Sequence, residues 1–234
     1  MAITTIGLDG DDTLWHSESH FAVTTARFVE LLEPWVEPTT SAEHHLVEVE
    51  RRNLGLLGYG VKAFTLSMIE TAIEMSGATV PASAVQEILD WGKELLDHPV
   101  ELLDGVAETV DSLMADHQLL LITKGDLFHQ ESKLARSGLA EAFTGIEIVS
   151  EKDPATYRRI LARHRVAGDE FVMVGNSVRS DVLPVLEVGA RAVHVPYHVT
   201  WALEEAEAGD EVPTLRSLAD LPHLLGDWAG APDD

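Results

Sequence analysis

The sequence predicts an α/β fold with an all-helical insertion, and three observations support this class. Short apolar runs alternate with amphipathic segments over residues 104–197, whereas residues 17–103 carry only helical periodicity. One apolar run, residues 3–9, precedes the helical block. With 234 residues, 45% of them hydrophobic, the chain is long enough for one large domain or for a domain with an insertion.

The first elements in chain order are a strand and a block of helices. Residues 3–9 are expected to form a short buried strand. In the block that follows, apolar residues recur at three- and four-residue spacing, Gly77 ends one helical segment, and Pro81 precedes the next. We therefore predict a helical cap domain, residues 17–103, inserted into a core of residues 1–16 and 104–234.

The rest of the chain alternates between strands and helices. Strands are expected at residues 118–123, 145–150, 170–176 and 190–197, with helical segments between them. Helices of ten to fifteen residues between strands indicate a Rossmann-like parallel sheet with crossover connections. The final segment, residues 226–234, is expected to fray.

The composition excludes several classes of protein. The chain has 16 Lys and Arg against 40 Asp and Glu, a formal charge of −24, whereas a nucleic-acid binder needs a basic surface. It has no cysteine, which excludes disulfides and thiolate metal sites. No apolar run approaches membrane length, and no basic segment precedes an apolar one at the start. We expect a soluble cytoplasmic protein, either monomer or homodimer, that contacts neither nucleic acid nor membrane.

Chemically active side chains follow the predicted strands. Ligands of parallel sheets bind at the carboxyl ends of the strands, so residues at these ends are expected to converge on one site. The candidates are Asp9, Gly10 and Asp11 after the first strand, Thr123 and Lys124 after the second, Lys152 after the third, and Asn176 and Asp181 after the fourth.

Four motifs in this order make the chain resemble the haloacid dehalogenase superfamily of hydrolases, in the branch with a helical cap after the first strand. "LDGDDTL" resembles the first motif and "LLLITKG" the second. "EKDPATYRRIL" resembles the third and "VMVGNSVRSD" the fourth, so that the resemblance spans residues 3–197. Asn176 departs from the pattern, because the family usually has Asp there, and Asp12 stands where the family usually has Gly.

The residues of the first motif suit phosphoryl transfer. Asp9 is expected to attack phosphorus and form an aspartyl-phosphate, and Mg²⁺ would offset the repulsion between two anions. Asp11 is expected to protonate the leaving group and then to activate water. Gly10 would let the backbone approach the ligand closely.

The remaining candidates would hold phosphate and metal. Thr123, Lys124 and Lys152 are expected to bind the phosphate together with Gly10, and Lys152 would also steady Asp9. The expected Mg²⁺ ligands are Asp9, the backbone carbonyl of Asp11 that the resemblance implies, Asn176 and Asp181. The neutral amide of Asn176 should weaken metal binding modestly.

Several residues also have structural interpretations. Asp12 is read as a turn or capping residue, and Asp181 alone could cap a helix. His16 and His20 are expected at the hinge to the cap, and Trp15 and Trp35 are expected to pack against the cap.

The cap is expected to act as a lid that excludes water. Tyr59 and Lys62 lie in a glycine-rich segment, residues 51–64, and are candidates for reading the leaving group. A helix turn without ligand contact is the alternative for this segment.

These residues predict a Mg²⁺-dependent phosphatase that acts on a small phosphate monoester such as a sugar phosphate or nucleoside monophosphate. The alternatives are a 2-haloacid dehalogenase, a phosphomutase whose cap residues Arg51 and Arg52 hold a second phosphate, and a non-catalytic family member. Dehalogenases of the superfamily generally lack the second carboxylate, so Asp11 favours the phosphatase.

Overall fold

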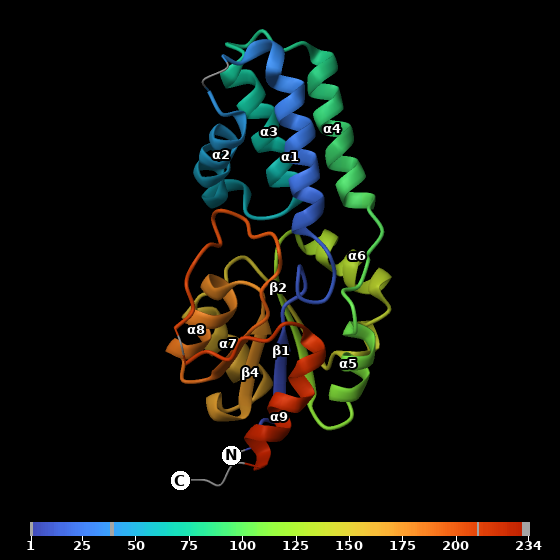
Figure 1. Ribbon diagram of the computed structural model, residues 1–234, viewed down its shortest axis with the longest axis vertical. Helices are drawn as coiled ribbons and strands as arrows, with labels where there is room; N and C mark the ends of the chain where they lie inside the picture. Colours follow the sequence, from blue (N-terminus) through green and yellow to red (C-terminus); the bar gives the residue numbers. More distant parts are fainter. Residues whose placement is uncertain (1, 38–39, 210, 231–234) are drawn as a thin grey trace. The chain divides into compact units, whose positions relative to one another are not determined.

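A computed structural model describes residues 2–37, 40–209 and 211–230 and confirms the predicted α/β class. Five parallel strands form one sheet in the order β3-β2-β1-β4-β5, with β1 in the middle (Figure 1). The strands are β1 (Thr5–Leu8), β2 (Gln118–Lys124), β3 (Gly145–Val149), β4 (Phe171–Gly175) and β5 (Arg191–His194).

Two compact units divide the chain. The α/β unit consists of the residues up to His16 and those from Val100 onward, and Ser17–Pro99 form the helical unit. The helices of the α/β unit are α5 (Val106–Leu113), α6 (Leu127–Ser137), α7 (Pro154–His164), α8 (Leu183–Glu187) and α9 (Leu221–Gly230), with short turns η2 (Ala140–Ala142), η3 (Gly168–Glu170), η4 (Val178–Val182) and η5 (Leu218–Asp220). The helical unit contains α1 (Glu18–Leu32), η1 (Glu33–Trp35), α2 (Ala42–Leu57), α3 (Val61–Met75) and α4 (Ala82–Asp97).

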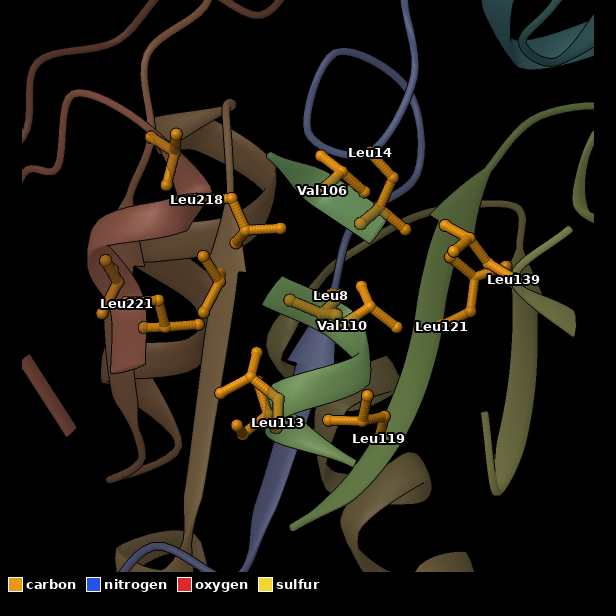
Figure 2. Close-up of a cluster of buried hydrophobic side chains, with 14 of the residues drawn as sticks. Leu8, Leu14, Val106, Val110, Leu113, Leu119, Leu121, Leu139, Leu218 and Leu221 are labelled. Carbon is orange, nitrogen blue, oxygen red and sulfur yellow. The ribbon is translucent and has the colours of Figure 1, made fainter. Parts of the chain in front are cut away.

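Alternating side chains of the strands feed two separate cores. In β2, Leu119 and Leu121 join the cluster that includes residues of α5 and α9, whereas Leu120 and Ile122 join the cluster that includes residues of α7, η4 and α8. Figure 2 shows the first of these clusters. Because successive side chains of a strand point to opposite faces, helices cover both faces of this sheet, as expected for a parallel sheet.

The helical unit has a core of its own. Apolar side chains from its four helices form one buried cluster, which includes Phe28, Leu46, Met68 and Ile88. Trp35 packs against this cluster, as the sequence predicted.

Two predicted segments differ from the structure. Residues from 226 onward were expected to fray, yet Leu221–Gly230 form a helix, because Leu225 is buried in the core and the Arg191 guanidinium stacks on the Trp228 ring at 4.8 Å. The last four residues of that predicted segment lie outside the described residues. The last strand ends at His194 instead of residue 197, and Pro196, which has no N–H for a ladder bond, lies just beyond. Among the helices described, none is both long and apolar enough to cross a membrane.

Candidate functional site

A lysine and two aspartates meet at the carboxyl ends of the strands. Asp9 directly follows β1, and its N–H continues the ladder by donating to the carbonyl of Val174 at 3.0 Å. The Nζ of Lys152 donates to Asp9 Oδ1 at 2.5 Å and to Asp181 Oδ1 at 2.6 Å. The fold thus brings three of the predicted site residues into one hydrogen-bonded group.

This group is almost fully buried. The exposed fractions of the side chains are 9% for Asp9, 2% for Lys152 and 0% for Asp181. Burial raises the pKa of Asp9 to about 7, since the opposing effect of Lys152 is partly offset by repulsion from Asp181. Burial alone would lower the pKa of Lys152, but the two carboxylates outweigh it and raise that pKa. Lys152 therefore stays charged at neutral pH.

Asp181 is held in place by the turn that follows β4. Its Oδ2 accepts a hydrogen bond from the backbone N–H of Ser177 at 3.0 Å, and its own N–H donates to the Ser177 carbonyl at 2.7 Å. Gly175 makes room for it: a Cβ at Gly175 would lie 2.2 Å from Asp181 Oδ2. The glycine of the fourth motif is thus required by the position of this carboxylate.

We expect Gly175→Ala to impair activity and stability together. The added methyl group must displace Asp181, and overpacking of this kind costs about 1–3 kcal/mol of the free energy of unfolding. Urea unfolding and kcat/KM measure the two effects. Gly55→Ala is the matched control, because nothing lies within 4 Å of a Cβ there and alanine favours the helix. Equal losses of stability and kcat/KM in Gly175→Ala and Gly55→Ala would contradict the conclusion that Gly175 makes room for Asp181.

The helical turn η4 depends on a partner that the sequence analysis missed. Pro184 has no N–H to donate to the Ser180 carbonyl one turn earlier, and the hydroxyl of Tyr157 donates to that carbonyl at 2.9 Å. Tyr157 comes from α7. Burial raises its pKa far above the ordinary value, and the negative charge of Asp181 raises it further. The residue acts as a neutral donor that ties α7 to the turn carrying Asp181.

Asp11 is held by donors from a different direction. Its Oδ1 accepts from Trp15 Nε1 at 2.6 Å and from Lys133 Nζ at 2.7 Å, and its Oδ2 accepts from Gln130 Nε2 at 2.9 Å. Burial acts to raise the pKa of Asp11, but Lys133 and the hydrogen bonds outweigh it, so the pKa is lowered. Sequence analysis missed Gln130 and Lys133, although their spacing of three residues on a predicted helix put them on one face.

The prediction for Trp15 was wrong. Its side chain is buried in the core of the α/β unit, where its ring contacts the first-motif turn. The turn folds back because Asp12 has φ +62° and donates its N–H to the carbonyl of Trp15 at 2.8 Å. This confirms Asp12 as a turn residue and accounts for the glycine usual at that position, since positive φ favours glycine and tolerates aspartate.

Gly10 is constrained by packing within the protein. A Cβ at Gly10 would lie 2.8 Å from the Trp15 ring and 3.3 Å from the hydroxyl oxygen of Thr123. Thr123 is buried at the end of β2, and its hydroxyl donates to the carbonyl of Lys124 at 3.3 Å. The second motif therefore lies against the first. Contact of Gly10 and Thr123 with phosphate stays a prediction.

Lys124 enters a network that the sequence did not indicate. Its Nζ donates to Glu204 Oε1 at 2.5 Å and to Ser180 Oγ at 2.8 Å. Glu204 also accepts from the hydroxyls of Ser177 and Ser180, each at 2.5 Å. Burial acts to raise the pKa of Glu204, but Lys124 outweighs it and the pKa is lowered. Glu204 lies in the long segment after β5, where no motif marks it.

The other candidates are Asn176, from the fourth motif, and the residues expected at the hinge and in the cap. Asn176 directly follows β4, is half-buried, and accepts a hydrogen bond from His194 through its backbone carbonyl at 3.1 Å. His16 ends the first segment of the α/β unit, and His20 lies in α1 of the helical unit. Tyr59 lies in the connection between α2 and α3, and Lys62 is exposed in the first turn of α3. Their role in reading a substrate stays a prediction.

The donor set is compatible with Mg²⁺. In the described ranges, no group of three or more His, Cys, Asp or Glu side chains forms a preassembled metal cage. Mg²⁺, however, is normally bound through one or two carboxylates, with water and substrate phosphate completing its octahedron. Asp9 and Asp181, which share Lys152, supply two such carboxylates at the strand ends.

The fold and the strand-end carboxylates define an α/β protein with an acidic site, and comparison with known proteins gives its family. The family model for haloacid dehalogenase-like hydrolases matches residues 3–189. The chain belongs to this family, as the four motifs predicted. No curated protein matches the chain.

Solved structures share the fold. A haloacid dehalogenase-like hydrolase from Xanthomonas campestris is 44% identical with a TM-score of 0.86, covering 98% of this chain and 94% of that one. A 2-haloacid dehalogenase from Pseudomonas syringae pv. tomato is 23% identical with a TM-score of 0.63, covering 97% and 99%. A magnesium-bound HAD hydrolase from Bacillus subtilis is 16% identical with a TM-score of 0.67, covering 96% and 99%.

Proposed function

We propose that the protein is a Mg²⁺-dependent phosphatase that hydrolyses a small phosphate monoester, such as a sugar phosphate or nucleoside monophosphate. The observation that carries the proposal is a second carboxylate beside the nucleophile. Asp11 follows Asp9 by two residues, contributes to raising the pKa of Asp9, and keeps 30% of its side chain exposed. An accessible acid or base therefore lies next to a buried carboxylate.

The chemistry of the leaving group explains why this second carboxylate favours phosphate esters. Halide leaves a carbon atom without needing a proton, so a dehalogenase can work with the nucleophile alone. An alkoxide leaves phosphorus much more readily when an acid protonates it, and this is the contribution expected of Asp11. Asp11 thus has a use in ester cleavage that it lacks in dehalogenation.

The proposed reaction has two steps on Asp9. First, a carboxylate oxygen of Asp9 forms a bond to phosphorus and the bond to the ester oxygen breaks. Asp11 gives its proton to that oxygen from its protonated form, which is the minor form in the resting site because Lys133 and the hydrogen bonds lower its pKa. Water then attacks the aspartyl-phosphate, Asp11 takes up a proton from the water, and inorganic phosphate leaves. Both aspartates return to their starting states.

The other groups would stabilise charge during these steps. The ammonium of Lys152 touches Asp9 and would also offset the charge on the transferred phosphoryl group. Mg²⁺ held by Asp9, Asp181, the Asp11 carbonyl and Asn176 would supply positive charge between the two anions when bound. Thr123 and Lys124 are proposed to contact phosphate, and the helical unit is proposed to act as a lid with Tyr59 and Lys62 contacting the leaving group.

The test is a phosphatase screen with and without Mg²⁺. We expect release of inorganic phosphate from an aryl phosphate, and from some members of a panel of sugar phosphates and nucleoside monophosphates. EDTA should abolish this activity and added Mg²⁺ should restore it. Without the metal, its positive charge no longer offsets the repulsion between the Asp9 carboxylate and the substrate phosphate. Haloacetate, assayed in parallel, should release no halide. Metal-independent phosphate release, or halide release without phosphatase activity, would overturn the proposal.

A further inference from the structure

The helix α6 presents two polar side chains to the first motif. Asp126 begins the helix by accepting the N–H of His129 at 3.0 Å. Gln130 packs so closely on Gly125 that a Cβ there would lie 2.9 Å from its amide nitrogen. Lys133 follows Gln130 by three residues and so lies on the same face of the helix. Both side chains reach Asp11 from this one face.

Both carboxylate oxygens of Asp11 are bonded. Oδ1 accepts from Trp15 and Lys133 and Oδ2 accepts from Gln130, and Lys133 is the charged donor among these three. The side chain of Lys133 is only 12% exposed, whereas that of Asp11 is 30% exposed. The donors thus hold both oxygens of Asp11, while part of its side chain stays exposed.

We propose that Lys133 is a positioning residue that fixes the orientation of Asp11 toward the leaving group, an inference that rests on the proposed phosphatase function. Lys133 is the donor of the three that carries a charge, so its Coulomb attraction to the Asp11 carboxylate adds to the hydrogen bond and restricts the carboxyl group more than Trp15 or Gln130 does. A proton on Asp11 is transferred efficiently only when the carboxyl group is held in the correct direction. Lys133 itself neither gives nor takes a proton.

A purely structural role for Lys133 predicts a different effect of its replacement on activity. Loss of a structural contact lowers the activity toward all substrates in the same proportion, because it lowers the amount of folded enzyme. Loss of an oriented acid affects the step that releases the leaving group, and only where that group needs a proton. Aryl phosphates with acidic phenols need little help, whereas alkyl phosphates depend on it.

The experiment compares kcat/KM for p-nitrophenyl phosphate and for glycerol phosphate in Lys133→Met and Lys133→Arg. The parameter kcat/KM reports the reaction up to release of the leaving group. Loss of Lys133 would also raise the pKa of Asp11 and favour its protonated form, but we expect the loss of orientation to dominate. Lys133→Met should then lower kcat/KM about 10²-fold for the alkyl ester, at the lower end of what a general acid contributes. The value for the aryl ester should stay nearly unchanged, and Lys133→Arg should restore most of the loss. Lys93→Met, at an exposed lysine of α4, is the control.

The outcomes separate this inference from the proposed function. Equal losses for both esters, or no loss, would overturn the positioning role while leaving the phosphatase intact. If the wild type hydrolyses neither ester, the proposed function fails, and the indole N–H resonance of Trp15 then tests the contact directly. This resonance, assigned with Trp15→Phe, should shift in Lys133→Met and stay in place in Lys133→Arg. An unshifted resonance in Lys133→Met would overturn the inference.

Discussion

Replacement of Asp9 by asparagine is expected to abolish turnover while the fold persists. The amide is nearly isosteric with the carboxylate but cannot attack phosphorus, and loss of a nucleophile costs at least about a thousandfold in kcat. The unfolding temperature should change little, because Lys152 keeps its bond to Asp181. Phosphate release and thermal unfolding, measured on the same preparation, check the two halves of this prediction.

The matched control is Asp12→Asn, three positions further along the same turn. Asparagine tolerates the positive φ of this position as aspartate does, so the variant should keep most of its activity. Loss of activity in Asp12→Asn alone would mean that Asp12 has been misread as a turn residue. Retained activity in Asp9→Asn would place the nucleophile elsewhere.

Replacement of Lys152 by methionine is expected to have the second large effect, on activity and stability alike. The change leaves two buried carboxylates, Asp9 and Asp181, without the cation that both contact. Removing one partner from a buried ion pair costs about 3–5 kcal/mol of the free energy of unfolding. Urea unfolding in metal-free buffer measures this loss, and phosphatase assays measure the loss of activity.

The pH dependence of this loss has a definite sign. Burial already raises the pKa of Asp9 to about 7 in the wild type. The folded wild type therefore binds more protons than the unfolded chain between about pH 4 and 7 and loses stability over that range. Without Lys152, whose charge lowers the pKa of Asp9, that pKa should rise further, so Lys152→Met should go on losing stability above pH 7, where the loss from Asp9 levels off in the wild type. Lys93→Met, at an exposed site, should follow the wild-type profile, and a gap between Lys152→Met and the wild type that does not widen above pH 7 would contradict a charged pair.

The parts of the site that the sequence predicted are those that strand ends determine. Asp9 and Asp181 each follow a strand of a parallel sheet, and such a sheet brings its carboxyl ends to one edge whatever the details of packing. The same logic predicted Lys152 in their company. The succession of strands and helices along the chain could also be read from periodicity, because buried strands and amphipathic helices have different repeats.

The parts that could not be predicted depend on how helices and loops rotate against the sheet. Lys133 and Gln130 carry no motif, and only the packing of α6 turns them toward Asp11. Glu204 lies in an irregular segment whose path has no periodic signal. Trp15 was misplaced for a related reason, since a single positive φ at Asp12 reverses the chain and turns the indole into the core.

The middle position of β1 has a consequence for the order in which the protein acquires its structure during synthesis. Thr5 pairs with Gln118 on one side and with Phe171 on the other, so β1 leaves the ribosome long before either of its neighbouring strands. Ser17–Pro99, whose contacts are local, is complete before either partner strand exists. An apolar strand therefore stays unpaired while Ser17–Pro99 is synthesised, a stage at which assistance by chaperones would be most valuable.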